Sequence, residues 1–114
     1  MVTIVDLQLE IVRRFEKFKN KRYLEEIKKI AEEIFREKLD RVIIFGSYVK
    51  GNMRPLSDID VAIILKEQAN EEERLRFYKE VNRRFGIHPF EFHIITKEEW
   101  ENWYKRFIKE YVEV

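Results

Sequence analysis

The segment of residues 58–65, DIDVAIIL, limits the possible folds more than any other part of the chain. After its two acids it is apolar on both faces, and such a strand belongs in the middle of a sheet, covered on both sides. Two further β-branched or aromatic runs, residues 41–45 and 89–95, are bounded by glycine or proline and also predict strands. The chain is therefore expected to contain a small sheet whose central strand begins with two acids.

Helical patterns surround these strands. Apolar residues recur at helical spacing over residues 11–39, with a break near Asn20, and the last predicted helix opens at residue 96 with the capping box formed by Thr96 and Glu99. A helix over residues 70–86 is indicated by an asparagine cap, three acids in its first turn and a terminal glycine. Together the elements predict an α+β (α/β-like) fold, a small mixed sheet with helices packed on it.

The last predicted helix carries many aromatic residues. Five large side chains are expected along one of its faces: Trp100, Trp103, Tyr104, Phe107 and Tyr111. This stripe is interpreted as a core face, with contact to a partner chain as the alternative.

The length of 114 residues predicts one domain, with N-terminal helices over 1–40, a catalytic core over 41–95 and a C-terminal helix over 96–114. Lys and Arg number 23 against 22 Asp and Glu, so the net charge of +1 argues against nucleic-acid binding. Cysteine is absent, which excludes disulfides and thiolate chemistry. No apolar run is long enough for a membrane span, and the acidic start does not resemble a signal peptide, so a cytoplasmic location is expected.

The two acids of the central strand are the first candidates for chemistry. Asp58 and Asp60 alternate with Ile59, so both carboxylates are expected on one side of the strand, about 6 to 7 Å apart. Two like charges beside a buried strand repel each other and lose hydration, and a divalent metal would offset both costs. The alternative is that both acids lie at a solvated strand tip or cap a turn. For an isolated pair of acids, this alternative is favoured.

The preceding strand ends in a second candidate feature. Gly46 and Ser47 open a loop over residues 46–57, which is expected to hold a turn of helix, and their N–H groups and hydroxyl can face a phosphate. Lys50 and Arg54 in the same loop add positive charge. Beside a metal site, such a loop suits a nucleoside triphosphate with Mg²⁺.

A third acid lies in the last predicted strand. Glu91 is flanked by two phenylalanines and shares its face of the strand with His93, so it would complete a three-carboxylate site for two metal ions if this strand pairs with the Asp58 strand. The alternative is a solvated carboxylate on an edge strand. His88 and His93 are assigned to packing or to the surface, with assistance beside the carboxylate strand as the alternative.

These residues carry a resemblance to a family. The sequence GSYVKG at residues 46–51, followed by SDID at residues 57–60, resembles the signature of the minimal nucleotidyltransferases of the DNA polymerase β superfamily. The resemblance runs from about Val42 to Ile95, and Glu91 occupies the place of the family's third acid. Many members have Ala-Arg in the variable part of the loop and Asp as the third acid, where this chain has Val-Lys and Glu.

The resemblance implies a nucleotidyltransferase fold like the palm of polymerase β, and roles for eight residues. The catalytic and metal-binding residues would be Asp58, Asp60 and Glu91, and the nucleotide-binding residues would be Gly46, Ser47, Lys50, Arg54 and Ser57. The implied reaction is attack on the α-phosphate of ATP, with two Mg²⁺ ions bound, transfer of AMP and release of pyrophosphate.

The small size of the chain bears on the acceptor. The chain is similar to antitoxins of HEPN-type toxin–antitoxin pairs, which implies that it AMPylates a tyrosine of a helical HEPN-type partner. A second copy of the chain is the other expected partner. The alternative function is a catalytically silent, nucleotide-binding interaction protein that neutralises its partner by binding.

Overall fold

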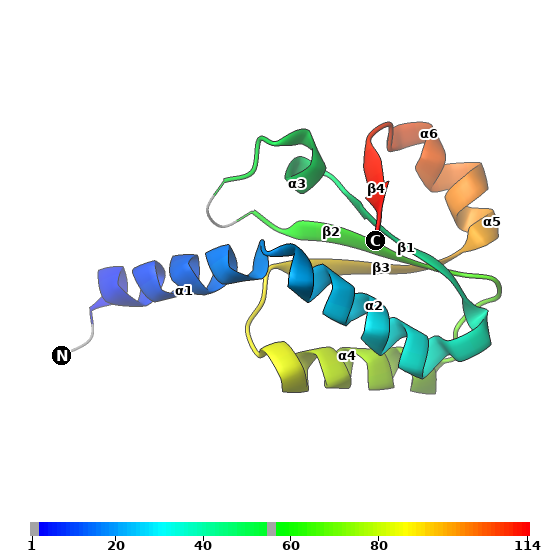
Figure 1. Cartoon of the computed structure of the whole chain (residues 1–114), viewed down its shortest axis with the longest axis horizontal. Coiled ribbons are helices and arrows are strands. Elements are labelled where there is room, and N and C mark those ends of the chain that lie inside the picture. Colours follow the sequence, from blue (N-terminus) through cyan, green and yellow to red (C-terminus); the bar gives the residue numbers. More distant parts are fainter. Residues whose placement is uncertain (1–2, 55–56) are drawn as a thin grey trace.

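In the described part of the chain, residues 3–54 and 57–114 of a computed structural model, one mixed sheet has the strand order β3-β2-β1-β4 (Figure 1). The elements, in chain order, are α1 (Ile4–Phe18), α2 (Lys21–Phe35), the 3₁₀ turn η1 (Arg36–Lys38), β1 (Leu39–Phe45), α3 (Ser47–Lys50), β2 (Ile59–Leu65), α4 (Glu71–Phe85), β3 (Phe90–Thr96), α5 (Lys97–Glu99), the π-helical turn η2 (Trp100–Tyr104), α6 (Lys105–Phe107) and β4 (Tyr111–Glu113).

The strand β2 lies in the middle of the sheet, as the sequence predicts. It pairs antiparallel with β1 and parallel with β3, and the parallel connection crosses over through α4. Six of its seven residues are buried, and Asp60 is the exception. The predicted α+β fold with a mixed sheet is therefore confirmed.

Each face of the sheet has its own apolar layer. On one face α2 and α4 pack side by side and form the larger core together with the strands (Figure 1). On the other face the segment from α5 to α6 covers a smaller cluster consisting of Ile43, Ala62, Ile64, Ile95 and Trp100. Alternation along each strand divides its side chains between the two layers.

One predicted helix end and one predicted strand start are wrong. Helix α2 ends at Phe35 and not near Leu39, because Arg36 has a positive φ of 51° and breaks the helical hydrogen bonding. The chain passes through η1 and enters β1 at Leu39, two residues before the predicted start. Three predicted ends are confirmed: Asn70 and Thr96 cap α4 and α5 through reciprocal capping boxes, and α4 stops before Gly86. The predicted turn of helix in the 46–57 loop is α3, and residues 55 and 56 of that loop lie outside the described residues.

The predicted C-terminal helix over 96–114 is also wrong in its last part. Residues 111–113 form β4, which pairs antiparallel with β1 and covers the edge of that strand. The aromatic stripe is consequently divided. Trp100 is fully buried and packs edge-on against Tyr111 of β4, with ring centroids 5.1 Å apart, whereas Trp103 and Phe107 remain 60% and 69% exposed.

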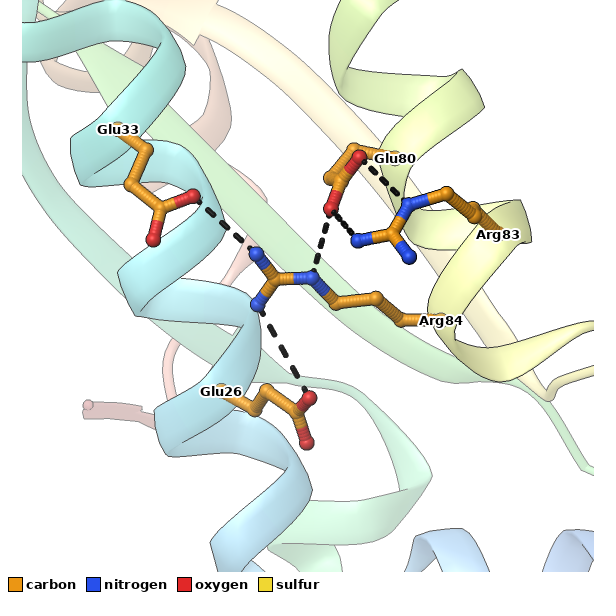
Figure 2. Close-up of polar contacts among 5 residues, drawn as sticks. All are labelled: Glu26, Glu33, Glu80, Arg83 and Arg84. Carbon is orange, nitrogen blue, oxygen red and sulfur yellow. Dashed lines mark hydrogen bonds and ion pairs between the residues drawn. The ribbon is translucent and has the colours of Figure 1, made fainter.

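A charged network joins the two helices of the larger layer. Arg84 of α4 lies 3.2 Å from Glu33 and 4.0 Å from Glu26 of α2, and 2.8 Å from Glu80 of its own helix (Figure 2). Arg83 pairs with the same Glu80 at 2.6 Å. The hydrogen bonds from Arg83 and Arg84 lower the pKa of the Glu80 carboxyl to about 2.

Helix α1 extends away from the sheet, in blue in Figure 1. Its far end carries exposed apolar side chains, and it is tied to the body near Phe18, which is buried among Tyr23 and Phe85. Arg14 also donates to the backbone oxygens of residues 85 and 87. Among the described helices, none combines the length and the apolar character that crossing a membrane requires.

Candidate active site

Two of the predicted acids meet on neighbouring strands. Asp60 of β2 is in register with Glu91 of β3, and side chains in register on parallel strands project to the same face. Asp60 is also the partner of Phe45, the last residue of β1. The pair therefore lies where β1 ends and where β2 and β3 begin, on the face covered by the segment from α5 to α6.

His93 completes this group, although the sequence analysis assigned it to packing. Its Nε2 lies 3.4 Å from Asp60 Oδ1 and 4.0 Å from Glu91 Oε1, and one ligand atom from each of the three residues falls within 4.8 Å of the others. The imidazole also contacts the rings of Phe45 and Tyr104, at centroid distances of 5.2 and 6.0 Å. The sequence did contain a signal for this role: His93 follows Glu91 by two residues, so both side chains lie on the same face of the strand.

Gly46 brings the end of β1 against the acidic group. Its φ of 80° and ψ of −152° belong to a region that only glycine occupies readily. A Cβ at this position would overlap Asp60 Oδ2, so the backbone of Gly46 approaches the carboxylate closely only because it lacks a side chain. The next two residues, Ser47 and Tyr48, begin α3, and helix geometry leaves their N–H groups without partners inside the helix.

Asp58 lies apart from the group formed by Asp60, Glu91 and His93. It precedes β2 and is exposed, and it does not belong to the set of ligand atoms that lie within 4.8 Å of one another. Ile59, between the two aspartates, is fully buried in the larger core. Because side chains alternate along a strand, Asp58 is expected on the same side as Asp60. Its role as a metal ligand stays a prediction.

The structure places the predicted nucleotide-binding residues around the same loop. Lys50 and Gly46 line a small cavity of about 80 Å³ together with Phe107 of α6. Ser57 accepts a hydrogen bond from the Arg54 N–H through its hydroxyl at 2.9 Å. Contact of these residues with a nucleotide remains a prediction.

His88 packs as the sequence analysis expected. Its Nδ1 accepts a hydrogen bond from the Phe90 N–H at 3.0 Å, and its ring packs against Phe90 and Phe92. Burial lowers the pKa of this imidazole below its ordinary value of 6.5, since the charged form loses hydration. His88 is therefore a structural residue at the start of β3.

The donor atoms near Asp60 fit a divalent cation. Two carboxylates and one imidazole nitrogen are ligands that such ions accept, and ligands held about 2.1 Å from one ion lie about 3 to 4 Å apart. The separations of His93 Nε2 from the two acids, 3.4 and 4.0 Å, are in this range. Asp60 and Glu91 would hold the ion, next to the turn that begins with Gly46 and Ser47.

The mixed sheet, with acids on two neighbouring strands beside a glycine-serine turn, agrees with the nucleotidyltransferase fold that the resemblance implies. Residues 25–112, from α2 to β4, match the family model described as "Polymerase beta, Nucleotidyltransferase". The chain belongs to this family, and the resemblance found in the sequence is confirmed.

Individual relatives agree with this assignment. A protein of Methanocaldococcus jannaschii named "Putative protein adenylyltransferase" is 42% identical over 60 residues, which is 53% of this chain and 61% of that protein. A solved structure described as "Crystal structure of putative nucleotidyltransferase" is 36% identical with a TM-score of 0.63, and the match covers 81% of this chain and 97% of that one. A nucleotidyltransferase structure from Sulfolobus solfataricus, also named putative, shares the fold at 24% identity and a TM-score of 0.56, over 92% of this chain and 83% of that one.

Proposed function

We propose that this chain is a divalent-metal-dependent nucleotidyltransferase that transfers AMP from ATP to a hydroxyl group of a partner protein. The observation that carries the proposal is the close approach of the Gly46 backbone to the Asp60 carboxylate, with Glu91 in register beside it. This arrangement puts a phosphate-binding turn next to paired acids, which is what a metal-bound triphosphate requires.

The chain's own residues have separable roles in this reaction. The N–H groups at the start of α3 and the Ser47 hydroxyl bind the β- and γ-phosphates, and Lys50 adds positive charge beside them. Asp60 and Glu91, with Asp58 as a further ligand, would hold a divalent ion, which would neutralise phosphate charge and lower the pKa of the acceptor hydroxyl. Glu91 accepts the hydroxyl proton. A bond forms from the acceptor oxygen to the α-phosphorus, the bond to the β-phosphate oxygen breaks, and pyrophosphate leaves.

The choice of AMP and of a protein acceptor follows from similarity. The relative from Methanocaldococcus jannaschii bears a name that specifies protein adenylylation, and its match to this chain covers 61% of its length. We propose a tyrosine of a helical HEPN-type toxin as the acceptor, with the chain as its antitoxin in the cytoplasm. Self-modification within a homo-oligomer is the second acceptor arrangement.

One observation favours the alternative of a catalytically silent binding protein. Asp58 lies outside the group in which Asp60, Glu91 and His93 approach one another, and the place of the third carboxylate in that group is taken by an imidazole. In this alternative the chain binds a nucleotide and covers its partner without transferring AMP.

Transfer is tested with ATP labelled at the α-phosphate. The chain, alone and with a HEPN-type protein, is incubated with the label and either Mg²⁺ or Mn²⁺, and both proteins are weighed intact. We expect an AMP-sized mass increase on the partner that disappears in Asp60→Asn and in Glu91→Gln. Asp40→Asn is the matched control, because Asp40 pairs with Arg41 at the opposite end of β1. Partner binding without label under both metals would support the silent protein instead.

A further inference from the structure

We propose that His93 is a direct ligand of the ion held by Asp60 and Glu91, and that it makes the site prefer Mn²⁺ to Mg²⁺. The inference deepens the proposed function, on which it rests for the presence of a divalent ion at this position. It adds an imidazole nitrogen to a site that the sequence analysis described with carboxylates alone.

The position of His93 carries the argument. In β3 it follows Glu91 by two residues, so the two side chains leave the same face of the strand. Its Nε2 is 3.4 Å from Asp60 Oδ1 and 4.0 Å from Glu91 Oε1, and an ion placed among these three atoms can contact all of them at coordination distance.

The imidazole is also held in place. Phe45, at the end of β1, and Tyr104, in the π-helical turn η2, contact the His93 ring at centroid distances of 5.2 and 6.0 Å. The side chain is 25% exposed, so only one part of it reaches solvent. Contacts with two aromatic neighbours restrict the motion of the ring and favour an orientation with Nε2 near the acids, which is the preorganisation that metal ligands need.

An imidazole changes which ion suits the site. Mg²⁺ demands oxygen ligands, keeps its waters and loses affinity when a nitrogen takes one of its positions. Mn²⁺ accepts both carboxylate and imidazole ligands, and ions later in the first row bind nitrogen still more tightly. Two carboxylates with one imidazole therefore shift the balance from Mg²⁺ toward Mn²⁺.

His93 has a competing role that the test must separate. Its Nε2 could donate a hydrogen bond to Asp60 Oδ1 and orient that carboxylate without touching the ion, although 3.4 Å is long for such a bond. In that arrangement His93 is a positioning residue and the ion has oxygen ligands only.

Electron spin-echo spectroscopy of bound Mn²⁺ distinguishes the two roles. The chain contains two histidines, so labelling histidine with ¹⁵N gives a signal with two possible sources. We expect a directly coordinated ¹⁵N coupling on Mn²⁺ in the wild type and in His88→Gln, and its loss in His93→Phe. The phenylalanine keeps a ring between Phe45 and Tyr104 and removes the nitrogen. A bound Mn²⁺ without ¹⁵N coupling in the wild type would overturn the proposal.

Calorimetric titration with Mn²⁺ and with Mg²⁺ measures the preference. The wild type should bind Mn²⁺ about tenfold or more tightly than Mg²⁺, and His93→Phe should weaken Mn²⁺ binding by about tenfold or more with little change for Mg²⁺. Equal losses for both ions, or none, would contradict direct ligation. Both measurements use the unreacted protein, so a ¹⁵N coupling without AMP transfer would reject the proposed activity and retain the ligand assignment.

Discussion

Substituting Gly46 by alanine tests the close contact on which the site depends. The backbone of Gly46, with φ 80° and ψ −152°, lies in a region that costs other residues about 1 to 3 kcal/mol. The new Cβ would also overlap Asp60 Oδ2, so Asp60 must move. We expect a total loss of about 2 to 4 kcal/mol of unfolding free energy. For 114 residues the unfolding entropy is about 0.24 kcal/mol/K, so Tm falls by about 8 to 16 °C.

Gly51→Ala is the matched control. Gly51 also has a positive φ, 75°, but a Cβ there would have nothing within 4 Å. Gly51→Ala therefore carries only the cost of the left-handed backbone, about 1 to 2 kcal/mol of unfolding free energy, which lowers Tm by about 4 to 8 °C. Thermal unfolding followed by circular dichroism compares the two variants, and Mn²⁺ titration should show weakened binding only in Gly46→Ala.

A double-mutant cycle with Asp60→Ala isolates the overlap. In that background the carboxylate is gone, so Gly46→Ala should cost about 1 kcal/mol less than in the wild type. Equal costs in both backgrounds, together with a loss no larger than that of Gly51→Ala, would refute the inference that the Gly46 backbone and the Asp60 carboxylate are fixed against each other.

The remaining predictions concern the packing that supports the sheet. Arg84→Met should lower unfolding free energy by about 1 kcal/mol in urea titrations at low salt and by less at 1 M NaCl, whereas Arg83→Met, whose side chain is 68% exposed, should change little. The folded state depresses the pKa of Glu80, so the ionised Glu80 carboxylate adds to the unfolding free energy above pH 4.5. This stabilisation is lost as pH falls toward 2, and Glu80→Gln should remove the pH dependence. Burial depresses the pKa of His88, so the unfolded chain binds more protons below pH 6.5 and stability should fall there; His88→Gln should flatten this part of the curve, and an unchanged slope would contradict the assignment.

The sequence was informative wherever a local signal, such as the regular spacing of apolar residues or a helix cap, specifies the structure. The apolar pattern on both faces of residues 59–65 identified the central strand, and the asparagine cap at Asn70 and the capping box at Thr96 located two helix starts. Strand alternation and the glycine-serine turn are both local signals, and they identified Asp58, Asp60 and Glu91 as candidate acids whose function stays a prediction.

The features that the sequence did not reveal depend on distant contacts. Strand β4 is three exposed residues long, and only its pairing with β1 makes it a strand. The early end of α2 depends on a positive φ at Arg36, a residue type that gives no warning of it. The contact of His93 with Asp60 required the parallel register of β2 with β3, which no local pattern specifies.

That parallel register ties the site to the order in which the chain folds. Asp60 and Glu91 become neighbours only when the β2–α4–β3 crossover has closed, and such non-local pairing is expected to follow the formation of local helices. An ion that needs both carboxylates has no site before this closure and stabilises the native state alone. If the proposed ion binds at this site, added ion should slow unfolding and leave the folding rate unchanged, because it would bind only after the crossover has closed.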